Sequence, residues 1–230
     1  MAILMGIAIT QPLWAQQATT RNLIHFDEKK VHYGFQLGLF QGGLKTVPSD
    51  SFYQQDTFYK IQSESKTGFS LGVILNFALP PELLDFRFTP AVSFYEHSIN
   101  FYNQQDSSVI NKSQEVTSLD FPLLLKYKSQ RRHNHRVYVI GGFTPGIQVS
   151  GKHADSNSDE QVPISSFNLE ASIGIGMNLY LQMFNLAPEV RFSHNLNNMF
   201  SDNYSQENIY APNLKRIMPY RIAFILNFEG

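Results

Sequence analysis

The last stretch of the chain, from Met218 to Phe228, alternates between large apolar side chains and other residues. Because successive side chains of a strand point to opposite faces, Tyr220 and every second residue up to Phe228 form one apolar face. The opposite face carries Arg221 and Asn227. A closing strand of this kind is typical of a β-barrel that spans a membrane, but an edge strand of a soluble sandwich has the same pattern. The rest of the chain must decide between these two folds.

Seven earlier segments show the same alternation, with small or polar residues on one face and large apolar residues on the other. Most of them reach the roughly ten residues that a tilted strand needs to cross a bilayer. Together with the closing segment they make eight, an even number, as in bacterial membrane barrels. Gly141, Gly142 and Pro145 predict a bend or bulge in the fifth segment, so its outward face stays open. The eight segments are 31–40, 65–77, 86–97, 114–128, 136–150, 167–179, 186–193 and 218–228.

The connections between these segments alternate between long polar loops and short turns. They are 43–64, 78–85, 98–112, 129–135, 151–163, 182–185 and 194–215. Membrane barrels have short periplasmic turns and long outer loops, whereas a soluble sandwich gives no reason for this alternation. A lipocalin-like soluble barrel would place the apolar face inside, and the charged residues of the other face would then lie outside. We therefore predict an all-β fold, an eight-stranded antiparallel up-and-down transmembrane β-barrel in the outer membrane of a Gram-negative cell.

The composition agrees with contact to lipid and excludes some functions. Charged residues make up 16% of the chain, against about 25% in an ordinary soluble domain. Aromatic residues make up 13%, which suits the aromatic girdles of a membrane barrel. The formal net charge of −1 does not suggest a nucleic-acid partner. The chain has no cysteine, which excludes disulfides and thiolate chemistry.

The N-terminal residues read as a secretory signal peptide. The apolar stretch from Ala2 to Ile9 is too short for a membrane-spanning helix, which takes about 20 residues. We predict a signal peptide over 1–18, cleaved near Ala15 or a few residues later, and a barrel domain over 19–230. A short buried helix is the alternative, and the missing basic residues point to a start further upstream.

Ionisable side chains on the inward faces are the sharpest feature of the pattern. An eight-stranded barrel is just wide enough to be filled by side chains, and charges there must pair or be hydrated. We expect an ion-pair network that fills the lumen, with a small polar channel or gated path as the alternative. Glu170, Glu189, Arg191 and Arg221 are expected to form one cluster. The inward set is Lys66, Arg87, Asp120, Lys126, Glu170, Glu189, Arg191 and Arg221.

Enzymatic chemistry has little support in the sequence. Ser93 and His97 lie on one predicted strand, and Ser193 with His194 lies at a strand end. A Ser–His pair could serve nucleophilic attack, but no Gly-x-Ser-x-Gly motif or suitably placed acid accompanies either pair. We predict that the protein is not an enzyme.

Metal sites are also weakly supported. His133 and His135 flank one residue in a basic turn, and two ligands on a turn rarely suffice for a metal. Asp155, Asp159 and Glu160 could meet a cation weakly in the third long loop, where a solvated loop is the simpler interpretation. We expect no catalytic residue, cofactor, metal or small-molecule substrate.

The first long loop contains aromatic residues, Tyr53, Phe58 and Tyr59, close to Pro48. Exposed aromatic side chains can mark a surface for a partner. They can equally pack onto the mouth of the barrel, and the sequence does not choose between these two.

Three stretches resemble the PorT/SprT family of Bacteroidota, and the resemblance covers nearly the whole mature chain. They are FDEKKVHYGFQLGLF at 26–40, GGFTPGI at 141–147 and YRIAFILNFE at 220–229, with Asn22 and Leu23 in the lead-in. The resemblance implies an outer-membrane barrel required for type IX protein secretion and, in some species, gliding motility. It implies no catalytic residues.

The expected function is therefore a non-enzymatic component or assembly factor of type IX secretion, in contact with membrane lipid and other secretion proteins. A lumen filled by side chains is too narrow for a folded cargo, so contacts through loops or turns are expected. The alternatives are a structural or adhesive surface barrel of the OmpA type and, less favoured, a lipid-modifying enzyme.

Overall fold

The computed structural model describes residues 21–54, 58–80, 82–103, 108–150, 164–201, 208 and 210–230. The predicted signal peptide and the acidic loop residues Asp155, Asp159 and Glu160 lie outside these ranges. The described chain is β-structure with two short 3-10 helices, η1 (Asp50–Gln54) and η2 (Ala211–Asn213). Neither helix has the length and apolar character needed to cross a membrane.

In the described ranges, eleven strands form one antiparallel sheet. They make up eight barrel strands because three of the barrel strands are interrupted. Five are continuous: β1 (Val31–Pro48), β8 (His135–Ser150), β9 (Phe167–Tyr180), β10 (Asn185–Asn195) and β11 (Leu214–Glu229). The other three each consist of two pieces: β2 (Phe58–Glu64) with β3 (Lys66–Leu79), β4 (Leu84–Phe88) with β5 (Ala91–Asn103), and β6 (Val109–Asp120) with β7 (Leu123–Lys128).

Proline explains two of the three interruptions, since it has no N–H to donate to a ladder. Pro90 separates β4 from β5, and Pro122 separates β6 from β7. The ladder nevertheless continues, because the carbonyl of Pro90 accepts a hydrogen bond from the N–H of Val73 at 3.0 Å and that of Pro122 accepts one from Thr89 at 3.2 Å. The predicted barrel is confirmed, with eight barrel strands divided into eleven.

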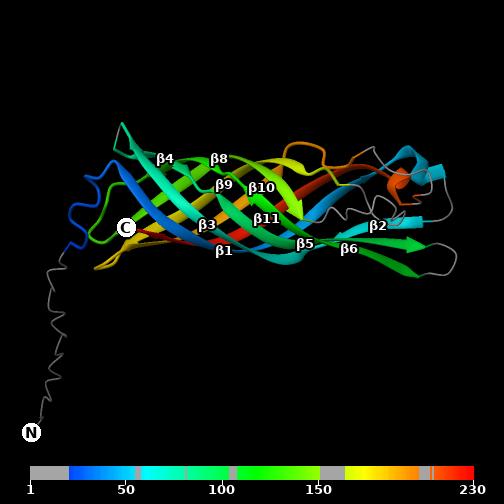
Figure 1. Ribbon diagram of the computed structural model, residues 1–230, viewed down its shortest axis with the longest axis horizontal. Helices are drawn as coiled ribbons and strands as arrows, with labels where there is room; N and C mark the ends of the chain where they lie inside the picture. Colours follow the sequence, from blue (N-terminus) through cyan, green and yellow to red (C-terminus); the bar gives the residue numbers. More distant parts are fainter. Residues whose placement is uncertain are drawn as a thin grey trace, which may run out of the picture.

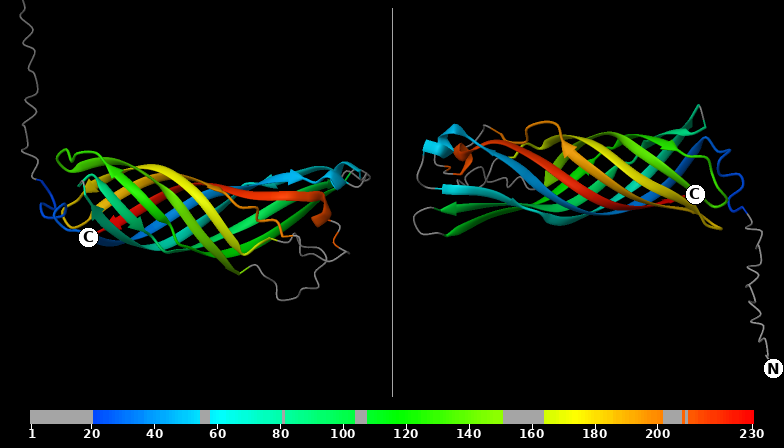
Figure 2. Two further views of the ribbon diagram at one scale, coloured as in Figure 1. Left: turned by 90° about the horizontal axis from the view of Figure 1, so that it is seen from above. Right: turned by 180° about the vertical axis from the view of Figure 1, so that it is seen from behind.

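The sheet closes on itself (Figures 1 and 2). Each barrel strand pairs antiparallel with the next, and β11 pairs with β1 along its length, with Phe224 opposite Leu39. Within the described ranges, closure gives the strands of the apolar wall partners on both sides. The short connections between β3 and β4, at 129–134 and at 181–184 lie with the C-terminus at one end, which we call the turn end. The opposite end, with η1 and η2, we call the loop end.

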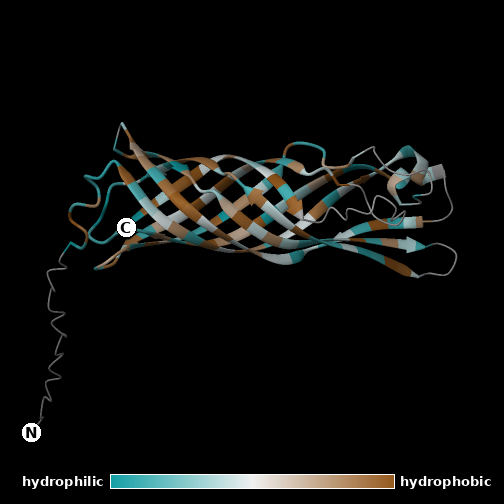
Figure 3. Ribbon diagram, in the orientation of Figure 1, coloured by the Kyte–Doolittle hydropathy of each residue, from teal (hydrophilic) through white to brown (hydrophobic). Residues whose placement is uncertain are grey.

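The two faces of the sheet point as predicted along the barrel wall. Ile173 is 67% exposed and Phe224 is 49% exposed on the outside, whereas Glu170 and Arg191 are buried. Figure 3 shows hydrophobic and hydrophilic residues interspersed along the strands of the wall. In β8, Gly141 to Pro145 pair with β9 in unbroken register, so the predicted bulge is absent there and Phe143 points outward. The alternative of a lipocalin-like barrel with an apolar interior is therefore wrong for this part of the barrel.

At the loop end the polarity of the two faces inverts. The inward side chains become apolar and form a separate core: Leu44, Phe58, Ile99, Phe101, Tyr210, Leu214 and Ile217. Lys45, Lys60 and Glu115 are exposed on the outside. Water replaces lipid as the surroundings of the strands at this level, so the apolar residues must turn inward.

Parts of three predicted loops are therefore regular structure. The ranges 43–64, 98–112 and 194–215 contain the ends of β1, β5 and β10, all of β2, the starts of β6 and β11 and both 3-10 helices. The aromatic residues of the first predicted loop lie in different surroundings, and a role of the exposed ones in binding a partner stays a prediction. Phe58 is buried, with its ring centroid 5.5 Å from that of Phe101, whereas Tyr53 and Tyr59 are 76% and 54% exposed.

Candidate functional site in the barrel lumen

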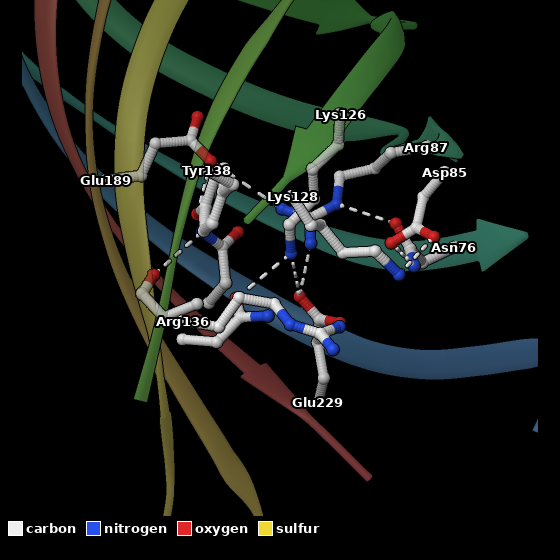
Figure 4. A network of polar contacts seen from close by, with 12 residues as sticks. Asn76, Asp85, Arg87, Lys126, Lys128, Arg136, Tyr138, Glu189 and Glu229 are labelled. Carbon is white, nitrogen blue, oxygen red and sulfur yellow. Dashed lines mark hydrogen bonds and ion pairs between the residues drawn. The ribbon is translucent and has the colours of Figure 1, made fainter. Parts of the chain in front are cut away.

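A cluster of charged side chains fills the lumen towards the turn end. Arg87 of β4 contacts Glu229 of β11, and its Nη1 lies 3.6 Å from Oε2 of Glu189 on β10. Nζ of Lys126 on β7 lies 3.8 Å from Oε1 of Glu229. These side chains are at most 1% exposed. Arg191 of β10 pairs with Glu189 as well. We call Arg87, Lys126, Glu189, Arg191 and Glu229 the turn-side cluster, and Figure 4 labels all of them except Arg191.

Tyr138 of β8 packs within the turn-side cluster. Its hydroxyl donates a hydrogen bond to Glu189 at 2.8 Å, and Nζ of Lys126 lies 4.0 Å from the centroid of its ring. Gly176 of β9 lies directly opposite Tyr138 in the sheet, and a Cβ there would come within 2.4 Å of the ring. The absence of a side chain at Gly176 therefore makes room for the ring that covers Lys126 and Glu189.

A second layer of pairs lies beside the turn-side cluster. Lys128 pairs with Asp85 at 2.6 Å, and Asn76 donates a hydrogen bond to Asp85 at 2.9 Å. Nε of Arg87 donates to the side-chain oxygen of Asn76 at 3.2 Å, which joins the two layers. Six barrel strands, those that contain β3, β4, β7, β8, β10 and β11, thus supply one network of hydrogen bonds and ion pairs.

A separate group lies nearer the loop end, and we call Asp120, Glu170 and Arg221 the loop-side cluster. Arg221 of β11 contacts Glu170 of β9 at 2.8 Å and Asp120 of β6 at 3.2 Å. Asp120 also accepts hydrogen bonds from the hydroxyls of Ser93 at 2.7 Å and Ser118 at 3.1 Å. Both carboxylate oxygens of Asp120 thus have hydrogen-bond partners from the protein, which replace the water that cannot reach a side chain only 4% exposed.

All the predicted lumen residues except Lys66 belong to one of these two clusters. Lys66 lies at the rim, 32% exposed, and pairs with Glu64 at 3.2 Å. The expectation that Glu170, Glu189, Arg191 and Arg221 form one cluster needs correction. Arg191 donates to Glu189 at 2.8 Å within the turn-side cluster, while Arg221 binds Glu170 in the loop-side cluster.

The stagger between strands explains this separation. Glu170 lies opposite Asn195 of β10, four residues along that strand from Arg191. Four residues of strand span about 13 Å. The side chain of Glu170 therefore lies much nearer the loop end than that of Glu189, although β9 and β10 are neighbouring strands.

The sequence interpretation missed several members of the network. Asp85 and Glu229 lie just outside the predicted strand ranges, although each is two residues from an inward residue, Arg87 and Asn227 respectively. Period-two alternation carried past the predicted ends would have placed both inside. The sequence does not assign Tyr138 to the lumen, because the glycines and the proline of its strand leave undetermined which face of the strand points inward.

The cavities around the clusters are small. The one beside Arg191 and Arg221 measures about 40 Å³, and the one beside Tyr95 about 30 Å³. Each has room for about one or two waters. A larger cavity of about 520 Å³ opens at the turn end.

The predicted candidates for chemistry show no catalytic arrangement within the described ranges. The hydroxyl of Ser93 donates to Asp120 rather than to an imidazole. No three His, Asp or Glu side chains of the described chain converge as metal ligands. The absence of catalysis, cofactor and metal stays a prediction.

These features define a class of protein, a closed membrane-spanning barrel with an apolar wall and a charged, filled lumen. A family model described as the outer membrane protein beta-barrel domain matches residues 14–201, and the chain belongs to that family. The protein is therefore an outer-membrane barrel. The solved structure of the outer membrane protein OprG from Pseudomonas aeruginosa is similar at 12% identity and a TM-score of 0.44, over 87% of this chain and 95% of that one. No curated protein matches the chain.

Proposed function

We propose that this protein is a non-enzymatic, non-conducting outer-membrane component that acts through contacts at its two ends. The observation that carries the proposal is the turn-side cluster, in which Arg87, Glu189 and Glu229 are at most 1% exposed and cross the lumen between β4, β10 and β11. Ions or solutes would have to displace these paired charges, at a cost of several kcal/mol for each charge left unpaired.

The loop end provides the larger surface for contacts. The strands there extend past the apolar wall, and their own apolar core holds them together. Tyr53 and Tyr59 are exposed on this extension. A rigid extension with exposed aromatic side chains suits binding to another protein at the cell surface.

The more specific proposal is a component or assembly factor of type IX protein secretion. It is supported by the resemblance of 26–40, 141–147 and 220–229 to the PorT/SprT family. A structural or adhesive surface barrel is the second candidate, favoured by the same exposed aromatic side chains at the loop end.

Deletion of the gene separates these two candidates. Loss of type IX cargo from the medium and cell surface, restored by the wild-type gene, is expected of a secretion component. Complementation with Tyr53→Ser and Tyr59→Ser together tests whether the loop end makes the contact, with Lys45→Ser as the matched surface control. A deletion strain that secretes every type IX cargo normally would defeat the secretion role.

Conduction is tested separately in planar bilayers. We expect no stepwise current from the purified protein, while a general porin in the same bilayer gives steps. Regular conductance steps from the wild-type protein would favour the small polar channel instead.

A further inference from the structure

We propose that the cavity at the turn end is a binding site for a small soluble oxyanion that carries carboxylate or phosphate groups. This cavity of about 520 Å³ lies between residues 26–30 of the lead-in segment, which comprises residues 21–30, and the ends of the barrel strands. Its volume is within the range of about 300–1,000 Å³ that is usual for small-molecule sites. The inference does not depend on the proposed role in secretion.

Nearly buried charges line the cavity. Lys126, Lys128 and Arg136 are 1%, 8% and 9% exposed, and all three line it together with Asp85 and Glu229. Figure 4 shows Lys128 and Arg136 beside the turn-side cluster. The cavity is therefore continuous with the ion-pair network and ends on it.

The network around this cavity contains more cations than anions. Three guanidinium groups share the carboxylate of Asp27, at 3.1 Å from Arg131, 3.2 Å from Arg136 and 3.6 Å from Arg21. The ion-paired cations of this end are Arg21, Arg87, Lys126, Lys128, Arg131, Arg136 and Arg191, against Asp27, Asp85, Glu189 and Glu229.

The ion pairs of this end thus contain three more basic than acidic side chains, and the exposed Arg132 adds to this surplus. The rim of the cavity does not change this surplus, since Lys29 and Lys30 are balanced by Glu28 and Glu82. A surplus of charge near the lumen is costly unless an opposite charge compensates it.

Two buried nitrogen atoms that line the cavity have no hydrogen-bond partner. They are Nε of Arg136 and Nδ1 of His32, in residues that are 9% and 4% exposed. Buried polar atoms in proteins nearly always have a partner. An oxyanion would supply an acceptor to the N–H of Arg136, and to Nδ1 of His32 in the tautomer that carries its proton there, and would compensate the positive surplus. Guanidinium groups bind carboxylate and phosphate in this way with charge-assisted hydrogen bonds.

The lead-in segment forms one wall of the site and is held firmly. The side chain of Arg131, 1% exposed, donates to the carbonyls of Asn22 and Leu23, and its guanidinium carbon lies 3.7 Å from the centroid of the Tyr180 ring. Phe26 stacks on His32 with centroids 4.0 Å apart. The wall is therefore preorganised, which reduces the entropic cost of binding.

The test is calorimetric titration of the purified full-length protein in detergent micelles with inorganic phosphate and, separately, with succinate. Chloride of matched ionic strength and spermidine serve as controls for non-specific charge effects. We expect saturable binding of at least one oxyanion and none of spermidine. Phosphate alone, succinate alone or both would each support the site and would identify the preferred group.

Arg136→Gln removes the unpartnered Nε and leaves Asp27 paired with Arg131. We expect the affinity for the oxyanion to fall about tenfold or more, as for loss of a charged hydrogen bond. Arg132→Gln, an exposed arginine of the same end, is the matched control and should leave binding unchanged. His32→Phe keeps a ring against Phe26 and removes Nδ1, so it should weaken binding even if Arg136→Gln fails to fold. Absence of saturable oxyanion binding to the wild type, or equal binding by both arginine variants, would overturn the proposal.

Discussion

At the scale of single residues, Gly176 decides whether Tyr138 can reach the turn-side cluster. A Cβ at Gly176 would lie 2.4 Å from the Tyr138 ring and 2.9 Å from the carbonyl oxygen of Pro188. We predict that Gly176→Ala lowers the free energy of unfolding by about 1–3 kcal/mol, the usual cost of overpacking. Urea unfolding in lipid vesicles measures the change. Gly141→Ala, whose Cβ would meet its nearest atom at 3.3 Å, should cost clearly less. Equal effects would contradict the steric explanation.

Arg87 is the residue on which the turn-side cluster depends most. It is fully buried and lies between Glu189 and Glu229, so its loss leaves carboxylates with weaker compensation. We predict that Arg87→Met destabilises the barrel by about 3–5 kcal/mol, as for breaking a buried ion pair. Adding Glu229→Gln to Arg87→Met should restore part of the loss, because the charge left unpaired is then removed. A double-mutant cycle of the four proteins measures the coupling, and additive effects would show that the two side chains do not interact.

At the scale of elements, the sequence predicts the faces of the barrel strands far better than their ends. Alternation with a period of two places residues such as Ile173 outside and Glu170 inside without knowledge of the neighbours. The ends of the strands are not recognisable in the sequence because the polarity of the two faces inverts at the loop end, where Lys60 faces water and Phe101 faces the core. A polar outward face there has the composition of a loop.

The clusters could not be predicted from single strands for a related reason. A sequence assigns Glu189 and Arg221 to the lumen but does not give the stagger between β9, β10 and β11. That stagger determines which charges meet. Only the register pairs Arg221 with Glu170 and leaves Arg191 with Glu189.

The turn 129–134 and the lead-in segment form a further unit of this scale. Arg131 joins them through the carbonyls of Asn22 and Leu23 and through Asp27. We predict that Arg131→Ala makes the segment 21–30 at least tenfold more sensitive to limited proteolysis, while the barrel remains resistant. The exposed neighbour Arg132→Ala should have no such effect. Unchanged cleavage in Arg131→Ala would show that other contacts hold the segment.

At the scale of the whole molecule, the inversion of polarity determines how the barrel lies in the outer membrane. The apolar wall from Tyr33 to Leu39 on β1 faces hydrocarbon, and the extension beyond Gly43 faces water. Outer-membrane barrels place short turns in the periplasm and long loops outside the cell. The surplus of positive charge near Arg136 is therefore on the periplasmic side, and the exposed Tyr53 is on the cell surface.

This orientation can be tested directly because the chain has no cysteine. We predict that a membrane-impermeant maleimide labels Lys60→Cys on intact cells, since Lys60 is exposed on the extension of β2. It should label Lys29→Cys only after the outer membrane is permeabilised, because Lys29 lies at the turn end. Ile173→Cys should stay unlabelled in both conditions, because that side chain points into lipid, where a thiol is not ionised and the reagent does not enter. Labelling of Lys29→Cys but not Lys60→Cys on intact cells would mean that the barrel is inserted in the opposite direction, and labelling of Ile173→Cys would mean that its apolar wall faces water.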